Sequence, residues 1–152
     1  MKSFLAAALL AVFSCGTAYA EETPLGDWLV KDGTARIRIV RCGNALWGVI
    51  SWTKGPAGKD TNNPDPAKRD RSIMGLPILI NMKPAGKQWD GQVYNAENGE
   101  TYTAHISLLS PDTLQIEGCG LWGLVCGGES WTRVQLPKGA PSDQTVCSGV
   151  AK

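Results

Sequence analysis

The fold of this chain follows most directly from residues 35–52, ARIRIVRCGNALWGVISW. In its first half Ile37 and Ile39 alternate with arginines, which is the period of a β-strand with one buried and one solvated face. Gly43-Asn44 then predicts a tight turn, after which a second apolar segment begins. The stretch therefore predicts a β-hairpin.

Short segments of this kind recur along the chain. Eighteen glycines and nine prolines separate them, at the spacing expected of an all-β sandwich or barrel. Because all links but one are short, the segments close most simply into a single antiparallel up-and-down β-barrel of about eight strands, with a β-sandwich as the alternative. The predicted strands are 26–30, 35–42, 45–52, 76–82, 88–94, 101–109, 113–119 and 129–136.

Residues 1–20 have the composition of a secretory signal peptide. An apolar run at 4–13 follows a basic start, and the small side chains of Ala18 and Ala20 fit a signal-peptidase site. We expect cleavage after Ala20 and a periplasmic or secreted protein. A lipoprotein signal ending at Cys15 is the alternative, although the residues before Cys15 fit that pattern poorly.

The rest of the chain has the length of one domain, and we expect a barrel domain at 21–136 followed by a C-terminal tail at 137–152. No segment after the leader approaches the roughly 18 apolar residues of a membrane-spanning helix. The 15 basic and 14 acidic residues nearly cancel, so nothing favours nucleic acid or an acidic membrane surface as a partner. We therefore expect neither nucleic-acid binding nor a membrane span.

Four of the five cysteines lie outside the leader: Cys42, Cys119, Cys126 and Cys147. In an exported chain an even number predicts two disulfides, and three connectivities are open. The chain has one histidine and no C-x-x-C pair, so a zinc site would need an unusual ligand set. We expect no metal.

Residues able to perform catalysis are few. A serine nucleophile needs a base, usually histidine, within hydrogen-bond distance. His105 is the only histidine, and the sequence contains no G-x-S-x-G motif that would mark a nucleophilic serine. Asp90 and Glu117 could meet across the sheet as paired carboxylates, but acidic residues on wet strand faces are common. We expect a protein that is not an enzyme and has no cofactor, with a hydrolase as the remaining alternative.

The tryptophans of the first and last strands are more informative. Trp28 stands in Gly26-x-Trp28, while Trp131 and Arg133 share one face of the last strand. The first and last strands of a closed barrel are neighbours, so Arg133 is expected over the ring of Trp28 in a cation–π contact. We assign these residues a structural role, which is to close one end of the barrel.

Gly26-x-Trp28 together with a late arginine resembles the structural signature of lipocalins and their calycin relatives. A larger set of motifs resembles a bacterial exported family, the domain of unknown function DUF2147, over about residues 25–136. The resemblance implies a lipocalin-like barrel and brings no settled activity. The motifs are Arg41-Cys42-Gly43, Leu46-x-Gly48-x-Ile50-x-Trp52, Asp60, Asn63-Pro64, Arg69-x-Arg71, Trp89-x-Gly91-x-Val93-Tyr94, Asn98-Gly99-x-x-Tyr102, Leu114-x-Ile116-x-Gly118-Cys119 and Trp131-Thr132-Arg133.

The resemblance also suggests the disulfide pairing. Members of the family often have a second cysteine where this chain has Trp47, so Cys42 lacks that partner here while the tail gains Cys147. The comparison implies that Cys119 pairs with Cys126, and that Cys42 pairs with Cys147 and ties down the tail.

A barrel of eight strands has room for packed side chains or for one small ligand. We expect a binding protein for a small apolar ligand, because Gly48 and Ala104 are small enough to leave space; a filled core is the alternative. The long connection at 53–72 would be the lid. Its arginines could face an acidic head group, with solvated positions on the loop as the more common alternative for basic residues. The predicted ligand contacts are Ile50, Trp52, Tyr102, Ile106, Arg69 and Arg71.

A non-catalytic protein-interaction module is the second hypothesis. Such an inhibitor or envelope-assembly partner would use the long connection together with exposed tryptophans such as Trp47 or Trp122.

Overall fold

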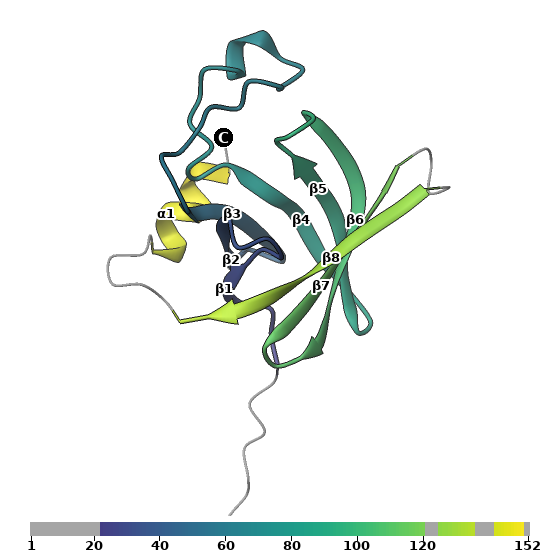
Figure 1. Cartoon of the computed structure of the whole chain (residues 1–152). Coiled ribbons are helices and arrows are strands. Elements are labelled where there is room, and N and C mark those ends of the chain that lie inside the picture. Colours follow the sequence, from purple (N-terminus) through teal and green to yellow (C-terminus); the bar gives the residue numbers. More distant parts are fainter. Residues whose placement is uncertain (1–21, 121–124, 136–141, 151–152) are drawn as a thin grey trace, which may run out of the picture.

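The computed structural model describes residues 22–120, 125–135 and 142–150. Eight strands form a closed antiparallel barrel in which each strand pairs with the next and β8 returns to β1 (Figure 1). The predicted up-and-down barrel is confirmed. The elements are β1 (Gly26–Leu29), β2 (Ala35–Cys42), β3 (Ala45–Thr53), the 3-10 helix η1 (Pro66–Lys68), β4 (Pro77–Ala85), β5 (Gln88–Asn95), β6 (Glu100–Ser110), β7 (Thr113–Gly120), β8 (Val125–Val134) and α1 (Asp143–Val150).

Three of the predicted features lie outside the described residues: the signal peptide with its cleavage site after Ala20, the alternative lipid site at Cys15, and the exposed Trp122. No helix among the described residues is long and apolar enough to cross a membrane.

The hairpin predicted from residues 35–52 forms as β2 and β3, but a β-bulge changes its last part. Arg36 pairs with Trp52 and Ile37 pairs with Ile50, so Ser51 is an extra residue on β3. An extra residue shifts the side-chain alternation of the bulged strand by one position. Trp52 therefore lies on the same face as Arg36, outside the barrel, while Ile50 stays inside.

One end of the barrel is closed by packed side chains and by Arg133. The Arg133 guanidinium lies 4.2 Å from the centre of the Trp28 ring, as the two sequence positions predict. It also donates hydrogen bonds to the carbonyl oxygens of Leu25, Thr23 and Pro111. Fully buried side chains fill the interior next to it, namely Trp28, Ile39, Leu46, Leu79, Met82, Ile106 and Leu114.

The outer face of β2 is not solvated, which corrects the expectation drawn from its alternating arginines. Arg38 is only 5% exposed and pairs with the buried Asp27 at 2.7 Å. The hydroxyl of Ser51 donates to the same carboxylate at 3.1 Å. Burial of this charge is tolerable because the pair is well hydrogen-bonded.

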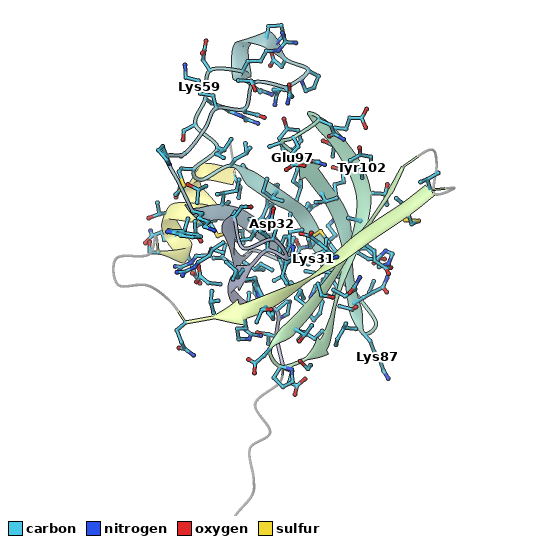
Figure 2. All side chains as sticks on the ribbon, viewed as in Figure 1. Lys31, Asp32, Lys59, Lys87, Glu97 and Tyr102 are labelled. Atoms are coloured by element: carbon cyan, nitrogen blue, oxygen red, sulfur yellow. A yellow bond between two sulfur atoms is a disulfide. The ribbon has the colours of Figure 1, made fainter. Side chains whose placement is uncertain are left out.

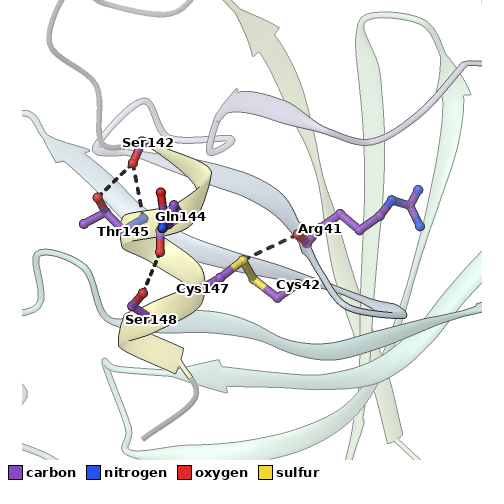
Figure 3. Close-up of a disulfide and its surroundings, with 7 residues drawn as sticks. All are labelled: Arg41, Cys42, Ser142, Gln144, Thr145, Cys147 and Ser148. Atoms are coloured by element: carbon purple, nitrogen blue, oxygen red, sulfur yellow. Dashed lines mark hydrogen bonds between the residues drawn. A yellow bond between two sulfur atoms is a disulfide. The ribbon is translucent and has the colours of Figure 1, made fainter.

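Helix α1, which the sequence analysis leaves as a tail, covers part of that face. Its Val146 packs against Val40 of β2 and Val49 of β3. A disulfide between Cys42 and Cys147 attaches the helix to the barrel (Figure 3). The second disulfide joins Cys119 to Cys126 across β7 and β8, so both pairs are those that the family resemblance implies.

Candidate functional site

A cavity of about 760 Å³ opens at the end of the barrel opposite Arg133. We call this end the mouth; the connections β1–β2, β3–β4 and β5–β6 lie there (Figure 1). Ligand-binding pockets in proteins have volumes of roughly 300–1,000 Å³. The cavity is therefore large enough for one small molecule.

Glycines of two adjacent strands border the hollow on the inner wall. Gly118 of β7 pairs directly with Gly127 of β8, and both line the cavity together with Gly120. A Cβ added at Gly127 would meet no atom within 4 Å. Gly127 therefore faces open space, whereas a Cβ added at Gly118 would lie 3.0 Å from a side-chain atom of Val93.

Gly48, which was expected to leave room, does not do so. A Cβ placed there would lie 3.0 Å from side-chain atoms of Ile37 and Leu79, which already occupy the space. Ala104 is buried between Gly91 and Gly118 in the row of small residues that continues to Gly127.

The cavity wall is mainly apolar. Three aromatic side chains line it, and the inner face of β8 adds the carboxylate of Glu129. Trp131 is buried, and its indole N–H donates to the carboxylate of Glu129 two residues earlier on the same face. Tyr94 and Tyr102 contribute from β5 and β6. The apolar side chains are Val30, Ala35, Ile37, Ile50, Ile78, Val93, Ala96, Ile116 and Val125.

The long loop, residues 54–76 between β3 and β4, is anchored beside the mouth by a buried carboxylate. Asp60 accepts hydrogen bonds from the hydroxyl of Tyr94 at 2.6 Å, from Asn63 at 2.8 Å and from Arg71 at 2.8 Å. Burial acts to raise the pKa of Asp60, but these hydrogen bonds outweigh it and the pKa lies below its ordinary value. Burial, followed by the bond to Asp60, raises the pKa of Tyr94.

A second contact holds the same loop to the β5–β6 turn. The side-chain amide of Asn62 donates to the carbonyl oxygen of Glu97 at 2.7 Å. The backbone of Asn62 passes so close to Gly99 that an added Cβ there would lie 1.8 Å from its carbonyl oxygen. The long loop is therefore attached to β5 through Tyr94 and to the β5–β6 turn through Asn62.

Comparison with known proteins identifies the family. Residues 26–133 match the family model described as "Uncharacterized protein conserved in bacteria (DUF2147)". The chain belongs to this family. No curated protein matched the sequence.

A solved structure shares the fold of this DUF2147 protein. It is protein HP1028 from the human pathogen Helicobacter pylori, which its description assigns to the lipocalin family. The TM-score is 0.66 at 20% identity, over 73% of this chain and 82% of that one. The lipocalin-like barrel is thus shown.

The predicted ligand contacts fall into two groups in this DUF2147 protein. Ile50 and Tyr102 line the cavity. Ile106 is fully buried in the packed half of the barrel. Trp52 lies on the outer side, where the Arg36 guanidinium sits 4.8 Å from its ring centre.

The two arginines expected at an acidic head group serve the loop instead. Arg69 donates to the carbonyl oxygen of Asn63 at 2.7 Å, and Arg71 is bonded to Asp60. Both guanidinium groups have partners within the loop because the loop folds around Asp60. They therefore do not line the cavity described above.

Sequence reasoning missed Glu129 and Tyr94 as cavity residues. The alternation of side chains along β8 could have identified Glu129, because Glu129 lies two residues from Trp131 and therefore on the same face. Only the family motif Trp89-x-Gly91-x-Val93-Tyr94 singles out Tyr94 in the sequence. Its position at the wall depends on the fold of a loop that no periodicity describes.

The residues considered for catalysis lie on the outer face of the barrel. Asp90, His105 and Glu117 are in register across β5, β6 and β7, and their neighbours Gly91, Ala104 and Gly118 face inward. His105 Nε2 lies 2.6 Å from the carboxylate of Glu117. This polar row is separated from the cavity by the sheet itself.

Proposed function

We propose that this protein is an exported, non-catalytic carrier or sensor that holds one small, mainly apolar ligand in the barrel cavity. Its two disulfides fit a protein that acts outside the cytoplasm. The signal peptide predicted at residues 1–20 extends this to cleavage after Ala20 and a periplasmic or secreted location.

One observation supports this function above all: the barrel contains a cavity of about 760 Å³ that is lined mainly by apolar side chains. Burial of a ligand's apolar surface against Ile37, Ile50, Val93 and Ile116 would contribute roughly 25 cal/mol for each Å² removed from water. A small apolar molecule that fills much of this space gains enough to bind.

The long loop lies beside the mouth, where a lid would be, and hydrogen bonds already attach it to Tyr94 and to the β5–β6 turn. Its hydrogen bonds with Tyr94 place the loop next to the cavity wall, while Asn63 and Arg71 of the loop donate to Asp60. A ligand would enter at the mouth, beside this loop.

A cavity-filling variant tests the proposal. Gly127→Phe puts a ring into space that contains no other atom within 4 Å of the added Cβ, so the barrel should fold. We expect the neutral fluorophore N-phenyl-1-naphthylamine to bind the natural protein saturably, and its affinity to fall about tenfold or more in Gly127→Phe.

Thr132→Phe is the matched control, because it adds the same ring to the exposed side of β8. It should bind the probe as the natural protein does. Absence of saturable binding, or equal binding by Gly127→Phe, would overturn the proposal and favour the protein-interaction module. For that alternative, Trp47 is half-buried, whereas Val125 near the mouth and Met74 of the long loop are exposed.

A further inference from the structure

The charged side chains that line the cavity all have the same sign. They are Asp32, Glu97, Glu100 and Glu129, and no lysine, arginine or histidine lines the cavity among the described residues. The chain as a whole is nearly balanced, with 15 basic and 14 acidic residues. The cavity wall is therefore negatively charged in a protein whose charges nearly balance.

Glu129 is the carboxylate inside the barrel. It pairs across the sheet with Ile116, a buried cavity residue, and accepts a hydrogen bond from the indole of Trp131. That bond satisfies only part of its capacity, since a carboxylate has about four acceptor positions. A donor on a ligand can use the others.

The other three carboxylates belong to the mouth. Figure 2 labels Glu97, in the turn between β5 and β6, and Tyr102 on β6. Glu100 accepts from the Tyr102 hydroxyl, and Asp32 accepts from Thr34. Lys54 interacts electrostatically with Asp32, so positive charge near the mouth offsets Asp32 in part. In the part of the chain that the structure describes, no basic side chain lines the cavity beside Glu129.

Aromatic side chains share the cavity with this negative charge, and the Trp131 indole is bonded to Glu129 itself. Trp131, Tyr94 and Tyr102 all line the same cavity. The faces of aromatic rings attract cations, and the attraction grows when water is removed. Rings next to a carboxylate are a suitable environment for an ammonium group attached to an apolar body.

The carboxylates do not converge on a metal ion. Among the described residues no group of three or more histidine, cysteine, aspartate or glutamate side chains is arranged to hold a metal. An organic cation fits better, because one positive group needs only one carboxylate and the aromatic faces.

We infer that the ligand is an amphiphilic organic cation, an apolar body bearing a protonated amine or a quaternary ammonium, with its charge placed toward Glu129. The inference rests on the proposed function and gives the ligand its chemical class. It reverses the sign of the head group expected from Arg69 and Arg71. An acidic ligand would place like charges together in a partly desolvated space, which is unfavourable.

Three dansyl probes with the same fluorophore and a linear chain of similar length test the charge preference. One ends in a primary ammonium, one in a methyl group and one in a carboxylate. We expect the ammonium probe to bind about tenfold more tightly than the methyl probe, equivalent to about 1.4 kcal/mol. The carboxylate probe should bind most weakly.

Two charge-neutralising variants locate the effect. Glu129→Gln keeps an oxygen that can accept from Trp131, so the barrel should retain its thermal midpoint. It should reduce the ammonium preference to about twofold or less and leave the methyl probe's affinity unchanged. Glu117→Gln removes an equal charge from the outer face, where His105 is its partner, and should keep the preference.

The outcomes separate the two proposals. If none of the probes binds, the proposed function fails and the inference fails with it. If the methyl or carboxylate probe binds as tightly as the ammonium probe, the cavity binds ligands but the inference is overturned. An equal effect of Glu129→Gln and Glu117→Gln would also overturn it, because the preference would then come from overall charge.

Discussion

Arg133 connects parts of the chain that lie far apart in the sequence. Its guanidinium stacks on Trp28 and donates to the carbonyl oxygens of Thr23, Leu25 and Pro111. Hydrogen bonds from a charged donor are worth about 1.5–3 kcal/mol each, and cation–π contacts add about 0.5–2 kcal/mol. Contributions in one network are not additive, so the sum is an upper bound.

Arg133→Ala should lower the free energy of unfolding by about 2–4 kcal/mol, because three carbonyl groups and a tryptophan face lose their partner. Urea denaturation gives the value. Arg41→Ala removes an exposed arginine from β2 and should change stability by less than about 0.5 kcal/mol. Similar losses in both variants would show that Arg133 does not close the barrel.

Asp60 gives the long loop a dependence on pH. Its pKa is below the ordinary value of 3.8, so the unfolded chain takes up the proton first as pH falls. The stabilisation by the carboxylate is therefore complete above pH 3.8 and is lost as pH falls through the folded-state pKa. At neutral pH, Asp60→Asn should cost about 1–3 kcal/mol, since Tyr94, Asn63 and Arg71 lose a charged acceptor.

The comparison is made by urea unfolding of the natural protein and Asp60→Asn at several pH values. The difference in stability should be constant from pH 7 to about pH 5 and shrink below about pH 3.8. Asp70→Asn is a suitable control, because its salt bridge with Lys59 joins two exposed side chains and contributes little. A gap that persists at pH 2 would show that the Asp60 charge does not hold the loop.

At the level of elements, the sequence predicted the features that depend on side-chain alternation within a strand or on which strands are neighbours. The bounds of β2 were predicted as observed, and the Trp28–Arg133 contact followed from strand parity and barrel closure. The position of Trp52 could not be predicted, because a single extra residue, Ser51, reverses its face and no residue type demands a bulge there.

Helix α1 escaped prediction for a different physical reason. Its eight residues have little apolar periodicity, and an isolated helix of that length is marginal in water. Tertiary contacts stabilise it: Val146 packs on Val40 and Val49, and Cys147 is bonded to Cys42. The sequence indicated only that the tail was attached, through Cys147.

The two disulfides should differ in their effect on stability. Cys42–Cys147 spans 105 residues and Cys119–Cys126 spans 7, and the chain-entropy relation assigns them about 4.7 and about 2.4 kcal/mol as upper values. The double variant Cys42→Ala/Cys147→Ala should therefore lose more stability than Cys119→Ala/Cys126→Ala, and its α1 amides should exchange rapidly. Calorimetry and hydrogen exchange measure both effects; equal losses would contradict the entropic account.

At the scale of the whole molecule, the barrel has a packed half and a hollow half. Periodicity separates inward from outward positions, but it does not say how deep a position lies or which residue faces it. The cavity depends on register, because Gly118 pairs with Gly127. Register follows from turns and bulges along the entire chain, so the open end and the acidic wall became visible only in three dimensions.

This asymmetry predicts a gradient of local stability along β8. Local opening is easiest where few apolar contacts hold a segment, so the peptide 125–129 at the mouth should exchange amide hydrogens about tenfold faster than the peptide 130–134 beside Trp28 and Leu114. Saturating N-phenyl-1-naphthylamine should slow exchange in the mouth peptide and leave the other unchanged, because ligand contacts would form only in the hollow half. In Gly127→Phe the added ring should slow the mouth peptide without ligand and remove the response to it. Uniform exchange along β8, or slowing of both peptides alike, would show that the two halves open as a single unit.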